Sequence, residues 1–134
     1  MRLSGTTVLL VEDDLDNLEL LTQCLEGEGA QVLPAGSIVV ALAISAGRRV
    51  DVVVSDLELP DGDGCALLRQ LRSREGYTQL PAIAVSGYSQ EQWRSQAATS
   101  GFHTFAVKPY AIDALVTLIA SLKAGGADDE SAAI

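Results

Sequence analysis

The chain of 134 residues has the length of one ordinary domain, and a hydrophobic fraction of 48% is enough for a sizeable core. Its 9 basic and 18 acidic residues give a net charge of −9 at pH 7, and such a surface repels phosphate backbones and anionic lipids. The composition therefore argues against direct binding of nucleic acid or membranes, and it favours divalent cations or basic partner surfaces.

Two further features indicate a cytoplasmic protein. The N-terminal apolar run TVLLV is too short for a signal peptide, because Glu12 ends it, and no apolar run approaches the ~20 residues that a membrane helix needs. Cys24 and Cys65 lie in separate apolar segments without a CxxC pair, so we expect them to be reduced and buried.

Strand-like and helix-like segments alternate along the chain. Short apolar runs predict strands at residues 7–11, 31–35, 50–55, 81–85 and 105–107. A helical pattern follows each of them, at residues 14–28, 38–46, 64–74, 90–100 and 112–122. Near-continuous apolar strands are typical of a parallel sheet that is buried on both faces. We therefore expect one α/β domain over residues 1–124, a doubly wound sandwich around a five-stranded parallel sheet, and a disordered acidic tail at 125–134.

Some of these elements depend on local signals other than periodicity. The segment 38–46 opens with strand-like residues (IVVALAIS), but Ser37 and Gly47 bracket it as cap and stop, and the alternation requires a helix. Pro34 lacks an amide donor, which places the second strand at an edge of the sheet. The helix at 90–100 has little besides Trp93 to bury, so we expect it to be loosely held.

Residues whose side chains can take part in catalysis or binding follow four of the predicted strands. Glu12 and Asp13 follow the first strand, Asp56 the third, Ser86 the fourth and Lys108 the fifth. Each has an ordinary explanation by itself, as a helix-start charge, a turn residue or a solvated side chain. Functional groups of such sheets gather at the carboxyl ends of the strands, however, so we expect these residues to share one pocket.

This set of side chains predicts phosphoryl chemistry. Clustered carboxylates repel one another unless a cation lies between them, and Mg²⁺ (or Mn²⁺) is the hard cation that prefers oxygen ligands. Lys108 can neutralise phosphoryl oxygens, and Ser86 can donate a hydrogen bond to one of them. Asp56 stands alone at the end of the central strand and is the best candidate for a nucleophile that forms an acyl phosphate. The first strand–helix turn, EDDLDN, has no glycine, which disfavours a dinucleotide site.

Four motifs in this order, VLLVEDD, DLELPDGDG, VSG and VKP, resemble the receiver domain of bacterial two-component response regulators. The resemblance covers roughly residues 6–123. It implies a flavodoxin-like fold with strand order 2-1-3-4-5. It also implies a switch that receives a phosphoryl group from a histidine kinase or a histidine phosphotransfer domain.

The resemblance implies specific roles at the metal site. Asp56 matches the phosphoacceptor and also a metal ligand. Asp13 matches the acid that binds Mg²⁺ directly, and Glu12 matches its neighbour, which acts through a water molecule. The main-chain carbonyl of Glu58 is implied as a further ligand.

The resemblance also implies a conformational switch. Ser86 matches the hydroxyl that moves to the phosphoryl group, and Lys108 matches the lysine that pairs with that group. Phe105 matches the switch position, where the family often has tyrosine. Its rotation would change the face of the fourth helix, fifth strand and last helix, through which the protein could self-associate. The side chains of Glu58 and Tyr88 are expected to control the attacking water.

The other acids of the region are assigned structural roles. Asp14 is expected to be a helix-start charge, and Asp61 and Asp63 to be turn and cap residues. Asp51 begins the third strand, far from the site, and is expected to be an ordinary solvated residue.

Two alternatives remain open. A phosphatase with an aspartyl-phosphate intermediate, as in haloacid-dehalogenase-like enzymes, would use an acid two residues after its nucleophile, and Glu58 has that spacing. The chain has no room for the cap domain of such enzymes. A receiver used only as an interaction module is disfavoured by the intact set of site residues. We expect no enzymatic activity beyond self-phosphorylation and self-dephosphorylation.

Overall fold

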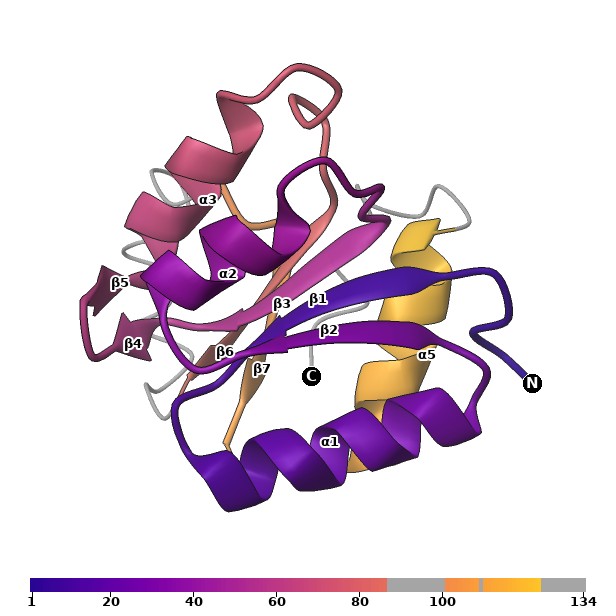
Figure 1. Cartoon of the computed structure of the whole chain (residues 1–134). Coiled ribbons are helices and arrows are strands. Elements are labelled where there is room, and N and C mark those ends of the chain that lie inside the picture. Colours follow the sequence, from indigo (N-terminus) through magenta and orange to yellow (C-terminus); the bar gives the residue numbers. More distant parts are fainter. Residues whose placement is uncertain (87–100, 109, 124–134) are drawn as a thin grey trace.

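The computed structural model describes residues 1–86, 101–108 and 110–123 (Figure 1). The expectations for the helix at 90–100, for Tyr88 and Trp93, and for the tail at 125–134 concern residues outside these ranges.

A five-stranded parallel sheet with the order β2-β1-β3-β6-β7 lies at the centre of the molecule. The strands are β1 (Thr7–Val11), β2 (Gln31–Ala35), β3 (Val52–Asp56), β6 (Ala82–Ser86) and β7 (Thr104–Val107). This is the predicted 2-1-3-4-5 order, so the predicted fold class is confirmed. Pro34 is exposed on the edge strand β2, where its missing amide donor costs no ladder hydrogen bond.

Helices cover both faces of the sheet. Those within the described residues are α1 (Leu15–Gly27), α2 (Ile38–Ser45), α3 (Gly64–Arg72) and α5 (Ile112–Lys123). Figure 1 shows α2 and α3 on one face, with α1 and α5 on the other. Each of these helices begins and ends within two residues of its predicted bounds.

Side-chain caps explain where three of the helices begin. The Asp14 carboxylate accepts the amide of Asn17 at 3.1 Å, and the Ser37 hydroxyl accepts the amide of Val40 at 3.2 Å. Asp63 caps α3 in the same way. These caps satisfy amides that a helix start leaves without partners, and the cap at Ser37 helps the strand-like segment of α2 to be a helix.

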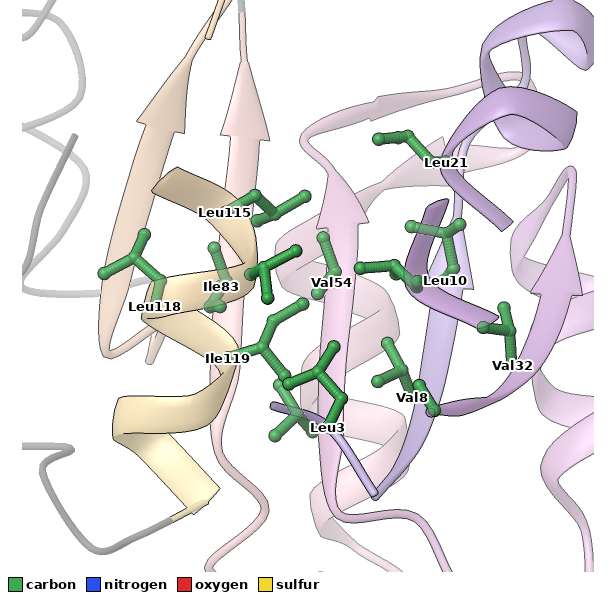
Figure 2. Close-up of a cluster of buried hydrophobic side chains, with 14 of the residues drawn as sticks. Leu3, Val8, Leu10, Leu21, Val32, Val54, Ile83, Leu115, Leu118 and Ile119 are labelled. Carbon is green, nitrogen blue, oxygen red and sulfur yellow. The ribbon is translucent and has the colours of Figure 1, made fainter. Parts of the chain in front are cut away.

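The alternation of side chains along each strand divides the core into two clusters. Leu10 and Val54 belong to the cluster that α1 and α5 cover. Figure 2 shows Leu115 of α5 in the same cluster. Leu9 and Val53 point the other way and pack with residues of α2 and α3. Because both faces are covered, the strands have no polar side and their sequences are almost continuously apolar.

The loop after β3 contains a small hairpin that the sequence did not predict. Its strands β4 (Glu58–Leu59) and β5 (Gly62–Asp63) pair in antiparallel fashion, with Glu58 opposite Asp63. Two-residue strands carry no periodicity, so only a turn was expected there.

Two expectations from composition can be compared with the structure. Cys24 and Cys65 are free thiols as expected, but both are half-buried, so the prediction that they are buried is wrong. Within residues 1–86, 101–108 and 110–123, no helix combines the length and the apolar character needed to cross a membrane.

The prediction that Asp51 is an ordinary solvated residue is wrong. Its side chain is only 10% exposed. One carboxylate oxygen accepts the amide of Thr7 at 2.7 Å and lies 3.6 Å from the ammonium of Lys123. The other oxygen pairs with Arg49 at 3.1 Å. Asp51 thus joins the starts of β1 and β3 to the end of α5, which is a contact between segments far apart in the sequence.

We predict that Asp51→Ala destabilises the protein by about 1–3 kcal/mol, because it leaves the half-buried Thr7 amide without its acceptor. Asp51→Asn should cost less, since its amide oxygen can still accept that hydrogen bond. Urea unfolding of both variants measures the difference. Equal losses in the two variants would show that the charge, and not the hydrogen bond, is what matters.

Candidate functional site

Three predicted site residues continue one face of the sheet beyond its apolar part. Glu12, Asp56 and Lys108 each stand two positions after a residue of the cluster beneath α1 and α5, namely Leu10, Val54 and Ala106. Side chains two positions apart on a strand share a face. The strand periodicity that builds the core therefore also directs two carboxylates and an ammonium to the same side of the sheet edge.

Lys108 binds both carboxylates. Its Nζ atom lies 2.9 Å from Oδ2 of Asp56 and 3.2 Å from Oε2 of Glu12. The side chains of Glu12 and Asp56 are 4% and 12% exposed, whereas the Lys108 side chain is 31% exposed. The arrangement is a partly buried ion triad that opens to solvent on the side of the lysine.

The triad changes the ionisation of the lysine. Burial alone lowers the pKa of Lys108, but the hydrogen bonds and negative charges of Asp56 and Glu12 outweigh it, so the pKa is raised above its usual value. Lys108 therefore stays protonated at neutral pH and can act as a fixed positive charge.

Main-chain amides orient the two carboxylates further. Oε1 of Glu12 accepts the amide of Asp14 at 3.1 Å, and the amide of Glu58 lies 3.4 Å from Oδ1 of Asp56. The Ser55 hydroxyl donates to the carbonyl oxygen of Asp56 at 2.9 Å. Each carboxylate thus has one oxygen toward the lysine and the other toward the backbone.

Asp13 completes an acidic cluster. Glu12, Asp13 and Asp56 each offer a carboxylate oxygen, and these oxygens all lie within 4.8 Å of one another. Mg²⁺ binds oxygens at about 2.0–2.1 Å, so oxygens on opposite sides of the ion are about 4 Å apart. The donor set, all carboxylate oxygens with an exposed Asp13, fits a small hard cation that keeps some of its water.

Ser86 and Phe105 lie on the other face of the sheet. Ala82, Ala84 and Ser86 are alternate residues of β6, so their side chains share one face of the sheet. Phe105 is paired with Ala84 on the neighbouring strand β7. The side chains of Ser86 and Phe105 are buried, at 3% and 8% exposure. The carbonyl oxygen of Ser86 accepts the amide of Lys108 at 2.7 Å, which joins the predicted switch residue to the lysine through the backbone. Glu58, by contrast, is exposed.

Gly64 belongs to the site, and it is not among the predicted site residues. A Cβ atom at this position would lie 2.5 Å from the carbonyl oxygen of Asp56. The glycine thus lets the first residue of α3 lie directly behind the nucleophile candidate. The available signal was a glycine at the first position of a predicted helix, where larger residues are normally tolerated.

Tyr110 was also not predicted. Burial, supported by the nearby charges of Glu12 and Asp56 and opposed by Lys108, raises its pKa to about 12. Its ring lines a groove of about 420 Å³ beside the site, together with Lys108 and residues of α1 and α5, namely Asn17, Leu20, Leu21 and Ile112.

The family model described as the response regulator receiver domain matches residues 8–120. This chain belongs to that family. It is thus a receiver domain, as its four motifs predicted.

Individual relatives come from more than one kind of protein. The receiver domain is 36% identical over 107 residues to an uncharacterised 14.6 kDa protein of Leptolyngbya boryana, covering 80% of this chain and 82% of that one. It is 36% identical over 110 residues to the KDP operon transcriptional regulatory protein KdpE of Escherichia coli, covering 82% of this chain and 48% of the regulator. It is 37% identical over 121 residues to the sensor kinase CckA of Brucella abortus, covering 87% of this chain and 12% of the kinase.

Solved structures agree with this assignment. A receiver domain from Methanospirillum hungatei superposes with a TM-score of 0.81 at 25% identity, covering 91% of this chain and 96% of the other. The receiver domain of a histidine kinase from Syntrophus aciditrophicus gives 0.79 at 26% identity, covering 95% and 96%.

We predict that Gly64→Ala destabilises the protein by about 1–3 kcal/mol, because the new methyl group must displace a backbone carbonyl. Gly27→Ala is the matched control, since Gly27 lies in α1 and its Cβ position meets nothing within 4 Å. That variant should be neutral or more stable. Urea unfolding compares the two, and a neutral Gly64→Ala would contradict the close approach.

We predict that Lys108→Met costs about 1–2 kcal/mol at pH 7, because it leaves two buried carboxylates without their cation. The loss is smaller than for a fully buried pair because the lysine is partly exposed. Adding Asp56→Asn to Lys108→Met removes one of the repelling charges and should restore much of the stability. A double variant no more stable than Lys108→Met would refute this account.

Proposed function

We propose that this receiver domain accepts a phosphoryl group from a partner phosphohistidine onto Asp56, in a Mg²⁺-dependent reaction. The observation that carries the proposal is the bridge from Lys108 to Asp56 inside the acidic cluster. Glu12 also contacts Lys108, but it is the more buried of the two acids, and its second oxygen binds the amide of Asp14. Asp56 is therefore the more accessible nucleophile.

The proposed reaction moves one phosphoryl group between two side chains. A carboxylate oxygen of Asp56 attacks phosphorus, a new P–O bond forms, and the P–N bond to the donor breaks. The donor imidazole takes the electron pair of that bond and, already protonated on its other nitrogen, leaves neutral. Asp56 has then lost its carboxylate charge, and the ammonium of Lys108 pairs with the phosphoryl oxygens instead.

The cation site has its own set of residues in this proposal. Glu12, Asp13, Asp56 and the main-chain carbonyl of Glu58 would hold Mg²⁺ or Mn²⁺. When bound, the ion neutralises negative charge on the phosphoryl oxygens. The side chain of Glu58 is free to influence access of the hydrolytic water.

The conformational response is proposed to pass through Ser86. Its backbone is bonded to Lys108, and its side chain lies on the same face as Phe105. Phe105 is already buried. We therefore propose that movement of Ser86 toward the phosphoryl group repacks the Phe105 ring within the protein, and does not move this ring from an exposed to a buried position. The surface of β7 and α5 would then change, and self-association there would be one outcome.

A phosphohistidine partner needs a surface beside Asp56. The groove next to Lys108 has apolar walls from α1 and α5, and on α1 the side chains of Leu15 and Leu20 are 73% and 50% exposed. Leu20 also lines the groove, and an apolar patch rimmed by polar residues is typical of a contact surface. We propose that a helix carrying the phosphohistidine of a histidine kinase or phosphotransfer domain packs against α1 there.

We predict that Asp56→Asn abolishes acid-labile phosphorylation by acetyl phosphate and Mg²⁺, because an amide is not a nucleophile of this kind. Asp16→Asn, on the exposed first turn of α1, should leave phosphorylation unchanged. Intact-protein mass spectrometry before and after acid treatment measures both. A wild-type protein that takes up no phosphoryl group would refute the proposal, and sustained turnover of p-nitrophenyl phosphate would favour the phosphatase alternative.

A further inference from the structure

Asp61 connects the loop of the site to a distant helix. It lies between β4 and β5, and its carboxylate accepts two amides at the start of α2, from Ile38 at 2.9 Å and from Val39 at 3.0 Å. The partners are 23 and 22 residues away in the sequence. Figure 1 shows the hairpin beside α2.

The contact is chemically well matched. The first amides of a helix have no partner within the helix, and its positive end attracts an anion. These two hydrogen bonds lower the pKa of the Asp61 carboxyl below its usual value, so the group is ionised at neutral pH. Ser37 binds the next amide, of Val40, so the two caps occupy different donors of the same helix.

A second contact holds the hairpin in the same place. Gly62 has φ +149°, and a Cβ atom there would lie 2.8 Å from Cδ1 of Ile38. Ile38 itself is buried, with 6% exposure. The hairpin therefore packs on the first residue of α2 through an apolar contact as well as through the two hydrogen bonds of Asp61.

The other side of the hairpin reaches the site. Glu58 pairs with Asp63 across the hairpin, and its amide lies 3.4 Å from Oδ1 of Asp56. The amide of Gly64 closes the loop by donating to the carbonyl of Leu57 at 2.9 Å. The main chain of Glu58 is thus held between Asp56, at the end of β3, and the hairpin that Asp61 fixes to α2.

We propose that Asp61 is a positioning residue: by fixing the hairpin to α2, it holds the main chain of Glu58 at the cation and phosphoryl site. This inference rests on the proposed function, in which the Glu58 carbonyl binds Mg²⁺. Asp61 is not one of the three acids of the cluster, and its two carboxylate oxygens accept amides of α2. Its loss should nevertheless weaken both Mg²⁺ binding and phosphorylation, because an outer residue that orients a ligand affects metal affinity.

The test compares Asp61→Ala with Ser37→Ala. Each variant removes one side-chain cap from the start of α2, but only the first releases the hairpin. Both should lower the melting temperature. Isothermal titration with MgCl₂ should show a roughly tenfold weaker Kd for Asp61→Ala and an unchanged Kd for Ser37→Ala. Asp61→Asn, whose amide oxygen can accept one of the two hydrogen bonds, should be intermediate.

Hydrogen exchange separates this inference from the proposed function. The amides of Glu58 and Gly64 should exchange faster in Asp61→Ala than in wild type or Ser37→Ala, whether or not Mg²⁺ binds. A wild-type protein without Mg²⁺ affinity would refute the cation site, while this exchange experiment would still test the role of Asp61. Unchanged exchange of the hairpin, or equal Mg²⁺ affinity in Asp61→Ala and Ser37→Ala, would reduce Asp61 to a helix cap and overturn the inference.

Discussion

The ion triad of Glu12, Asp56 and Lys108 constrains how the ends of three strands meet at one edge of the sheet. Two largely buried carboxylates are costly to bury, and one ammonium compensates both. The compensation works only if the ends of β1, β3 and β7 meet at one edge in the correct register. The site therefore forms only where the sheet is paired in this order.

The strand order explains why a lysine is the residue that neutralises the two carboxylates. β6 lies between β3 and β7, so the cation must reach across a whole strand to meet Asp56. A long aliphatic stem can cross that strand while its charged end stays among polar groups. The partial exposure of Lys108 leaves the ammonium able to exchange a carboxylate for another anion. A fully buried triad would be less open to a phosphoryl donor.

The hairpin after β3 extends this constraint to the far side of the sheet. Asp61 places the start of α2 in contact with the loop that also carries Glu58, and Gly64 lets α3 approach the backbone of Asp56. Elements on the α2 and α3 face thereby support a site whose charged side chains lie on the α1 and α5 face. A structural change on either face of the sheet can therefore move the main chain of Asp56 and Glu58.

The strands of the main sheet, the fold class and the charged side chains that cluster at the site could be predicted from the sequence, because they follow from local periodicity, from caps and from the ends of strands. The roles of Asp51, Asp61 and Gly64 depend on contacts between segments that lie apart in the sequence. Asp51 binds a residue 44 positions away, and Asp61 binds one 23 positions away. Gly64 is explained by a carbonyl behind it. Such contacts depend on how the chain returns to itself, and neither spacing nor composition carries that information.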